Sequence, residues 1–564
     1  MKYKFLGLIL VILSSFFAFR TLLIPGFFPM HDDTQVARVF EMGKVLGQGI
    51  FPVRWVPDLG YGYGYPIFNF YAPFAYYIGG FFLMAGFDAL VATKLMMGLG
   101  IVLAGISMYV LAREFWGEIG GFISGLFYLY APFHGVDIYV RGDVAEYYAY
   151  AFIPLAFYGI WKVYKTERLK FIIVGAFGYA GIILSHNLTA MMITPFLLFL
   201  IFLLCLATMR SKKIATIYLL LFTAFYGLLL SAFYWMPALL EMHYTNVFSQ
   251  IGGGADFHDH FICLRQLWDS PWGFGGSVPG CSDGLSFKIG KLHILFVLFS
   301  AVAFGFSYKN NPHRHALLFS YAGFLVTIFL TLNTSQFIWD SFSAMAFFQY
   351  PWRFLLLIAF FSSFIAGSVW LLIVFLGEKF PANRKLFVIG MIVFIFLFVY
   401  AQEKNFSPQT IVQRVASDFT SDAALRWKAS KISDEYMPPD FQKPNNENEI
   451  PSGVFILERG TSRIGESIEK VNRFEAKIEA LSPSIIRINI AYFPPWKILV
   501  NEKNIPFTIT KQGLLCSIPK GDHTVLAVFE ETMVEKLANT ISLIALIFLV
   551  IGIIVAKKKR RLDL

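Results

Sequence analysis

The chain has 564 residues, of which 57% are hydrophobic and only 15% are charged. Soluble domains carry roughly 25% charged residues, so the composition excludes an ordinary soluble protein and indicates one that crosses a membrane many times. The formal net charge of +10 does not indicate a nucleic-acid partner. The basic residues fall mostly in short loops between apolar runs, where they act as topology signals.

The first apolar run, Phe5 to Leu23, is long enough to span a bilayer as a helix. Lys2 and Lys4 precede it, which predicts that the N-terminus lies in the cytoplasm. Because no small-x-small cleavage site follows the run, we expect a membrane anchor rather than a cleaved signal peptide.

Further apolar helices are expected near residues 93–112, 119–134, 146–161, 171–186, 188–207, 214–234, 292–307, 316–333, 354–376, 386–401 and 537–556. Basic residues fall on every second connection, which the positive-inside rule places in the cytoplasm. This alternation requires residues 71–86 to form a re-entrant or interfacial helix. The sequence therefore predicts a polytopic α-helical membrane protein with about twelve transmembrane helices and both termini in the cytoplasm.

The remaining connections face the outside in this scheme, and they hold almost every unusual polar residue. A membrane domain over residues 1–401 would carry two long outer loops, 24–92 and 235–291. This distribution predicts an extracytoplasmic site. Cys263 and Cys281 share the second loop and could form a disulfide there, with two free thiols as the alternative.

Residues 402–535 differ from the rest, because prolines, charges and strand-like alternation return. The alternation is clearest in Arg473–Ala480 and Ile485–Ala491. We expect an extracytoplasmic antiparallel β-domain here. Residues 536–564 then form a final transmembrane helix with a basic cytoplasmic tail.

His31-Asp32-Asp33 follows directly on the first apolar run and precedes an amphipathic pattern typical of a helix on the membrane surface. One carboxylate can cap that helix, and we assign this role to Asp33. Asp32 is then left without an obvious basic partner. An acidic side chain at a membrane boundary is a candidate for function. Asp32 could act as general base on an acceptor hydroxyl or amide.

A second acidic motif, Arg141-Gly142-Asp143 with Glu146 three residues later, is expected on the same face. The spacing of Asp143 and Glu146 fits a capping box for the helix that follows. Alternatively, these carboxylates could orient an acceptor or hold a divalent ion such as Mg²⁺ or Mn²⁺. Arg141 could contact a phosphate. No metal-ligand set is assigned.

Tyr350, Trp352 and Arg353 end an outer segment just before a span. An interfacial aromatic belt with a snorkelling arginine would explain them. The functional alternative is a phosphate clamp, because the guanidinium fork suits phosphate oxygens. His186 lies at the outer end of a predicted helix and is either structural or part of the same site.

Several motifs together resemble those of the membrane protein family known as 6-pyruvoyl-tetrahydropterin synthase-related. They are His31-Asp32, Gly49–Trp55, Gly60–Pro66, Arg141–Asp143, Trp272–Gly275, Phe348–Arg353 and Tyr492–Lys497. This family is similar to the GT-C superfamily of membrane glycosyltransferases, which carries one acidic residue in the first outer loop and another in the next. Asp32 matches the first position and Asp143 the second. Asp33 stands beside Asp32, so the choice between them stays open.

The resemblance implies a glycosyltransferase of the plasma membrane that moves a hexosyl or pentosyl group from a polyprenyl-phosphate donor to an unidentified extracytoplasmic acceptor, in cell-surface glycan or glycoprotein assembly. Asp32 would be the base, with the donor phosphate near Arg353 and Arg141. The expected partners are this donor, the lipid bilayer and the acceptor. No cofactor is assigned, although a divalent cation, Mg²⁺ or Mn²⁺, could be held. The alternatives are a transporter or flippase for lipid-linked glycans and a non-catalytic envelope assembly factor.

Overall fold

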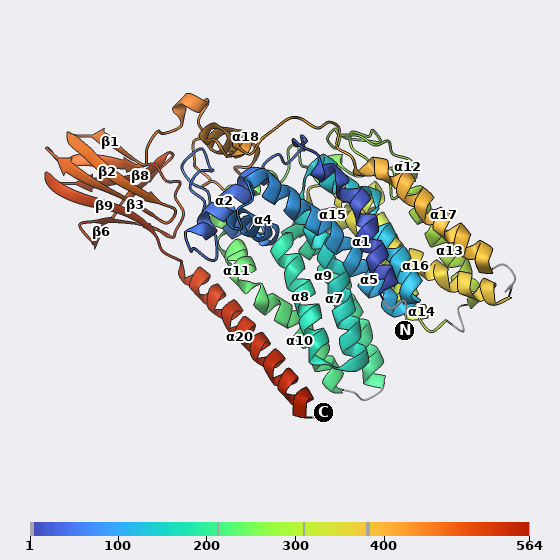
Figure 1. Cartoon of the computed structure of the whole chain (residues 1–564). Coiled ribbons are helices and arrows are strands. Elements are labelled where there is room, and N and C mark those ends of the chain that lie inside the picture. The colour runs from blue at the N-terminus through green and yellow to red at the C-terminus, as the bar shows by residue number, and fades with distance from the viewer. Residues whose placement is uncertain (1–4, 211–213, 308–310, 380–383, 563–564) are drawn as a thin grey trace.

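Long apolar helices make up most of the structure, and an antiparallel β-domain follows them near the C-terminus (Figure 1). The computed structural model describes residues 5–210, 214–307, 311–379 and 384–562. The helices are α1 (Leu6–Phe19), α2 (Gln35–Gly47), α3 (Ile67–Phe70), α4 (Phe74–Met84), α5 (Ala89–Leu129), α6 (Pro132–Val136), α7 (Val144–Thr166), α8 (Leu169–Ser185), α9 (Asn187–Arg210), α10 (Ile214–Leu230), α11 (Ala232–Leu240), α12 (Leu264–Trp268), α13 (Lys291–Ser307), α14 (Arg314–Thr331), α15 (Gln336–Ser341), α16 (Leu355–Lys379), α17 (Arg384–Glu403), α18 (Ser417–Thr420), α19 (Ser430–Ile432) and α20 (Met533–Leu562).

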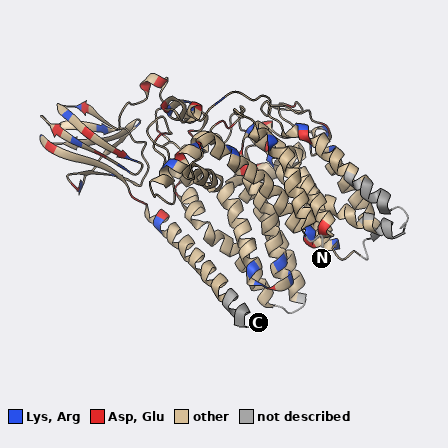
Figure 2. Ribbon diagram, in the orientation of Figure 1, with Lys and Arg blue, Asp and Glu red and all other residues tan. Residues whose placement is uncertain are grey.

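Within the described ranges, six helices are long and apolar enough to cross a membrane, or seven if the bent pair α10 and α11 forms one span. Helices α4, α8 and α13 are apolar but shorter. The count of about twelve spans stays a prediction. Figure 2 shows that charged residues are nearly absent from the middle of the long helices and gather at their ends and on the β-domain.

The helices run back and forth, so that their connections gather at two opposite ends of the bundle (Figure 1). Helix α1 begins and α20 ends at the same end, while the β-domain lies beyond the other. Within α5, Gly117 breaks the helix with φ +72°, so α5 is a hairpin of two helical arms. These arms correspond to the helices expected near 93–112 and 119–134. Gly105 and Gly125 let the arms approach closely, because a Cβ on Gly125 would lie 3.0 Å from the carbonyl oxygen of Gly105.

The amphipathic helix expected after Asp33 is α2, and it packs against α4, which lies within the residues expected to form a re-entrant or interfacial helix. A Cβ on Gly79 of α4 would overlap Val39 of α2, so the two helices are in close contact. We expected the polar face of α2 to be exposed at a membrane surface, but the structure buries it. Arg38 and Glu41 are both buried.

The β-domain consists of two antiparallel sheets. One sheet has the strand order β1-β4-β8-β7, and the other has the order β2-β3-β9-β5-β6. The strands are β1 (Phe455–Arg459), β2 (Ser462–Lys470), β3 (Arg473–Ala480), β4 (Ser484–Ile488), β5 (Trp496–Val500), β6 (Lys503–Asn504), β7 (Thr508–Thr510), β8 (Gly513–Ile518) and β9 (Gly521–Phe529). The C-terminal antiparallel domain is therefore confirmed, and β3 has the predicted bounds. Strands β1 and β2 were not predicted.

Residues 404–454, which we call the strap, connect α17 to the β-domain and lie across the membrane domain. The strap is joined to the chain just before Asp32 by an antiparallel bridge in which Phe27 and Val412 exchange backbone hydrogen bonds of 2.9 and 2.8 Å. Further along, Ser433 accepts a hydrogen bond of 2.9 Å from Arg38. The strap thus covers the polar face of α2.

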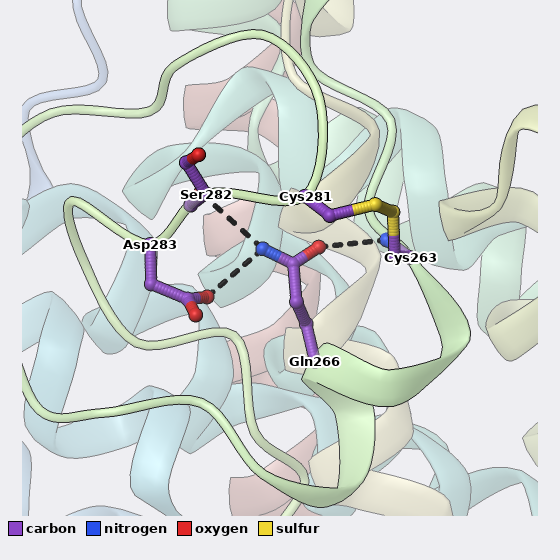
Figure 3. The surroundings of a disulfide bond; sticks show 5 residues. All are labelled: Cys263, Gln266, Cys281, Ser282 and Asp283. Atoms are coloured by element: carbon purple, nitrogen blue, oxygen red, sulfur yellow. Dashed lines mark hydrogen bonds between the residues drawn. A yellow bond between two sulfur atoms is a disulfide. The ribbon is translucent and has the colours of Figure 1, made fainter.

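The long loop between α11 and α13 contains a disulfide between Cys263 and Cys281, the first of the two alternatives left open by the sequence (Figure 3). Gln266 supports it: its side-chain oxygen accepts from the backbone N–H of Cys263 at 2.7 Å, and its amide nitrogen donates to Asp283 at 2.9 Å. The same loop reaches His31, whose Nε2 donates to the carbonyl oxygen of Phe274 at 3.1 Å. A cross-linked loop therefore lies directly beside Asp32.

Candidate functional site

The two acidic motifs meet through their backbones at one end of the helix bundle. The N–H of His31 donates to the carbonyl of Val140 at 3.1 Å, and the N–H of Asp32 donates to the carbonyl of Arg141 at 2.9 Å. Gln35 reinforces the contact, because its amide nitrogen donates to the carbonyl of Gly142 at 2.8 Å. Two segments that are more than 100 residues apart are thereby held side by side.

Two arginines and three carboxylates form a buried cluster behind this contact. Arg141 donates to Asp143 and to Glu146, each at 2.7 Å, and it also pairs with Asp137. Arg353 lies in the short 3-10 helix Pro351–Phe354 just before α16; it donates to Glu146 at 2.7 Å and lies 3.6 Å from Asp143. All five side chains are buried. Such a cluster is costly to desolvate unless every charge has partners, which these contacts provide.

Asp143 has the predicted local role at the start of α7, since its side chain accepts from the backbone N–H of Glu146 at 3.0 Å. The reciprocal half of the capping box is absent, because the Glu146 carboxylate points to the two arginines instead. Burial alone would raise the pKa of Asp143. The positive charges of Arg141 and Arg353 outweigh this effect and hold the pKa of Asp143 well below the ordinary range.

Asp32 and Asp33 have different environments. The carboxylate of Asp32 is partly exposed and has no hydrogen bond or ion pair with another side chain in the described part of the chain. The surrounding protein nevertheless removes enough water to raise its pKa, and the negative charge of Asp143 raises it further, while Arg38 acts in the opposite direction. Asp33 instead accepts a hydrogen bond of 2.7 Å from Arg414 of the strap, outside the cluster.

The predicted N-cap role of Asp33 is wrong. The N-cap of α2 is Thr34, which makes no side-chain capping bond. An ion pair with a residue far along the chain takes the Asp33 carboxylate away from the helix terminus. Asp32 is therefore the carboxylate of this pair that faces the cluster.

The aromatic residues before α16 flank the arginines. The guanidinium of Arg141 lies over the ring of Trp352 at 5.0 Å from its centre, and Tyr350 stacks on Trp352 at 5.0 Å between ring centres. Tyr350 lies beside the cluster and also contacts His260 of the long loop. Among the described residues, Arg353 Nε and Trp352 Nε1 are buried without a hydrogen-bond partner. Two buried donors beside the cluster are therefore unsatisfied within the described part of the chain.

His186 lies between α8 and α9, next to the cluster. Its Nδ1 contacts the hydroxyl of Thr189 at 2.8 Å and accepts from the Thr189 backbone N–H at 3.3 Å. Burial lowers the pKa of His186, although Asp143 and Glu146 oppose the shift. Asp143, Glu146 and His186 bring one potential metal ligand each within 4.8 Å of one another. Both carboxylates, however, already accept from arginines.

Several residues of the site were not predicted. Tyr76 donates to the side-chain oxygen of Gln35 at 2.6 Å, and Arg38 donates to Tyr76 at 3.3 Å while lying 4.3 Å from the centre of the Tyr71 ring. Gln35 and Arg38 follow Asp32 at positions three and six. On a helix that spacing puts both on one face, so a signal for their shared role was present.

The fold and this cluster define an integral membrane protein with a buried charged site at one end of its helix bundle. Residues 68–250 match the model of the family described as "6-pyruvoyl-tetrahydropterin synthase related domain; membrane protein", which confirms over this segment the resemblance drawn from the motifs. An uncharacterized protein of Lactococcus lactis subsp. cremoris is 24% identical over 294 residues. That alignment covers 50% of this chain and 46% of the relative, so the chain spans about half of the relative's length.

Two solved structures show a low likeness to this chain. The oligosaccharyltransferase of Archaeoglobus fulgidus, crystallised with Zn and sulfate, is 14% identical with a TM-score of 0.38, and the alignment covers 79% of this chain and 58% of that one. ArnT of Cupriavidus metallidurans, bound to undecaprenyl phosphate, is 12% identical with a TM-score of 0.35, and the alignment covers 76% and 78%. TM-scores this low establish neither the activity nor the ligands of this chain.

Proposed function

We propose that the chain is a GT-C-type membrane glycosyltransferase that transfers a sugar from a polyprenyl-phosphate-linked donor to an extracytoplasmic acceptor. The observation that carries this proposal is the partly exposed carboxylate of Asp32 beside the buried cluster of Arg141, Arg353, Asp143 and Glu146. It supplies a base and cationic donors at one end of a helix bundle, where a lipid-linked substrate and a water-borne acceptor can meet.

Asp32 would act as the general base. In the transfer step the acceptor oxygen forms a bond to the anomeric carbon of the sugar, and the bond from that carbon to the phosphate oxygen breaks. The acceptor proton passes to Asp32, and the electron pair of the broken bond remains on the phosphate. Because burial and Asp143 raise the pKa of Asp32, its carboxylate is a stronger base than an ordinary exposed aspartate.

Arg353 would bind the leaving phosphate. Its Nη1 is engaged by Glu146, which fixes the plane of the guanidinium, while its buried Nε is without a partner among the described residues. A phosphate oxygen would satisfy that donor, and a guanidinium is well matched to phosphate geometry. Positioning of the reactants and stabilisation of negative charge on the leaving phosphate would then lower the barrier. Asp143 and Glu146 act by orienting the two arginines.

The test uses membranes that contain the full chain and a radiolabelled polyprenyl-phosphate sugar, with transfer to the acceptors present in the membranes as the readout. We expect Asp32→Asn to lower the transfer rate by about 10²–10⁴-fold, the range typical of a general base. The matched control is Asp33→Asn, which changes the neighbouring carboxylate outside the cluster and should stay close to the wild-type rate.

Mass spectrometry of the purified proteins separates binding from chemistry. Asp32→Asn should still co-purify with the donor, because the base does not contact the lipid phosphate. An active Asp32→Asn variant would reject the assigned base. Wild-type protein that neither co-purifies with nor consumes any polyprenyl-phosphate sugar would reject the glycosyltransferase itself and favour a non-catalytic assembly factor.

A further inference from the structure

Asp143, Glu146 and His186, whose candidate ligand atoms lie within 4.8 Å of one another, have few lone pairs left to offer a divalent metal ion. Asp143 uses one carboxylate oxygen to cap α7 and the other to accept from Arg141 at 2.7 Å. Glu146 uses Oε2 to accept from both Arg141 and Arg353, each at 2.7 Å. Among the described residues, only Glu146 Oε1 of these four oxygens lacks a hydrogen-bond partner. One free carboxylate oxygen is a poor basis for a Mg²⁺ or Mn²⁺ site, since such ions take several oxygen ligands.

The histidine does not complete such a site. The backbone N–H of Thr189 donates to His186 Nδ1 at 3.3 Å, so Nδ1 is an acceptor. The proton of the neutral ring then sits on Nε2, and neither nitrogen presents a free lone pair. A metal at this position would have to displace either the contact with Thr189 or the proton on Nε2.

Charge also opposes a metal. Arg141 and Arg353 both contact Glu146 Oε2 and both lie within 4 Å of Asp143, so two positive charges already lie against the oxygens that a metal ion would need. An ion bound to the same oxygens would lie close to both guanidinium groups in a buried site, where like charges repel strongly. Each arginine is itself buried, so neither can move its charge into water without breaking its contacts.

We infer that the guanidinium groups of Arg141 and Arg353 occupy the place of a divalent cation, so that this site works without a bound metal. The paired arginines supply the same two positive charges, hold Asp143 and Glu146 in position, and leave Arg353 Nε without a hydrogen-bond partner among the described residues. The statement that catalysis needs no metal rests on the proposed function. The statement that the site binds no metal can be measured without it.

The first experiment needs no activity. Metal analysis of the purified full chain, with thermal unfolding before and after treatment with EDTA, should find substoichiometric divalent metal and no change in melting temperature. Titration with Mn²⁺ followed by electron paramagnetic resonance should show no tight site in the wild-type protein. A stoichiometric metal that EDTA removes with a fall in melting temperature would overturn the inference, as would a tight Mn²⁺ site in the wild type.

Variants of Arg353 test whether its positive charge is what opposes metal binding. Arg353→Ala removes one positive charge from Glu146, and its affinity for Mn²⁺ should rise by about tenfold or more as the repulsion falls. Arg353→Lys keeps the charge and should not gain affinity, and neither should Arg414→Ala, which removes an arginine from a carboxylate outside the cluster. Equal affinities in Arg353→Ala and Arg353→Lys would contradict the explanation. If Arg353→Ala does not fold, the wild-type measurements still decide.

Activity then separates the two proposals. Metal-free protein that transfers sugar at the wild-type rate supports both of them. If the protein binds no metal and transfers no sugar, the glycosyltransferase is rejected, but the inference that the two arginines occupy the place of a metal ion is retained. Transfer that stops on chelation and returns with added Mn²⁺ overturns the inference and retains the glycosyltransferase.

Discussion

Neutralising Asp32 and neutralising Asp143 should change the stability of the protein in opposite directions. The pKa of Asp32 is raised in the folded protein by burial and by Asp143, so its ionised form is less stable there than in the unfolded chain. Asp32→Asn removes that penalty and should raise the melting temperature at neutral pH. The pKa of Asp143 is lowered, chiefly by Arg141 acting against burial, so Asp143→Asn should lower the melting temperature.

The expected loss of stability in Asp143→Asn follows from the contacts of Asp143. Asparagine keeps the capping bond to the N–H of Glu146, so only the charge is lost. Breaking a buried ion pair completely costs about 3–5 kcal/mol, but Arg141 keeps Glu146 and Asp137, and Arg353 keeps Glu146. We therefore expect a loss nearer the value of one charge-assisted hydrogen bond, about 2 kcal/mol. For a chain of this length that lowers the melting temperature by a few degrees.

The assay is thermal unfolding of the purified full chain in detergent between pH 4 and 8. For Asp32→Asn, the gain should be largest at high pH and should vanish as the pH falls to the ordinary carboxylate pKa of about 4, where both proteins are neutral at this position. For Asp143→Asn, the loss should be complete at all pH values above about 4. Shifts of the same sign in the two variants at neutral pH would refute the electrostatic reasoning.

Two further variants test how the site is held together. Gln35→Leu removes the donor to the buried carbonyl of Gly142. It should lower the rate of sugar transfer by roughly 10–100-fold, because small displacements of reacting groups are costly. Gln48→Leu, at the exposed end of the same helix, is the control and should leave the transfer rate unchanged. Gly142→Ala should lower the free energy of unfolding by about 1–2 kcal/mol in chemical denaturation, because Gly142 has φ +68° and an added Cβ would overlap Met30. Gly254→Ala is the control, because a Cβ added there would have no atom within 4 Å, and it should leave the free energy of unfolding nearly unchanged. Equal losses of stability in the two variants would contradict this account.

The main features of the fold followed from local patterns in the sequence. Apolar runs predicted the long helices, and alternation predicted β3 with its observed bounds, because both signals depend only on neighbouring residues. The juxtaposition of Asp32 with the second acidic motif was also expected, since the alternation of basic loops put both on one face. What the sequence did not indicate was that the polar face of α2 is buried, because the strap that covers it comes nearly 400 residues later.

The errors at the site have the same physical origin. Asp33 was assigned to the nearest helix terminus, yet its partner is Arg414, 381 residues away. A capping box was one of the two roles considered for Glu146, yet its carboxylate binds Arg353, 207 residues away. Capping rules describe what a side chain does when only its own helix is near. In a buried site a distant charge competes for the same carboxylate and is the stronger partner.

The distance along the chain between Arg353 and the rest of the cluster has a consequence for biosynthesis. Asp137, Arg141, Asp143 and Glu146 are all made early, so a nascent chain that ends after α9 has three carboxylates facing a single guanidinium. The last positive charge is added only when the start of α16 leaves the ribosome. Until then the early helices carry excess negative charge that apolar surroundings disfavour. We therefore expect these helices to complete their packing in the bilayer only after Arg353 has joined the cluster.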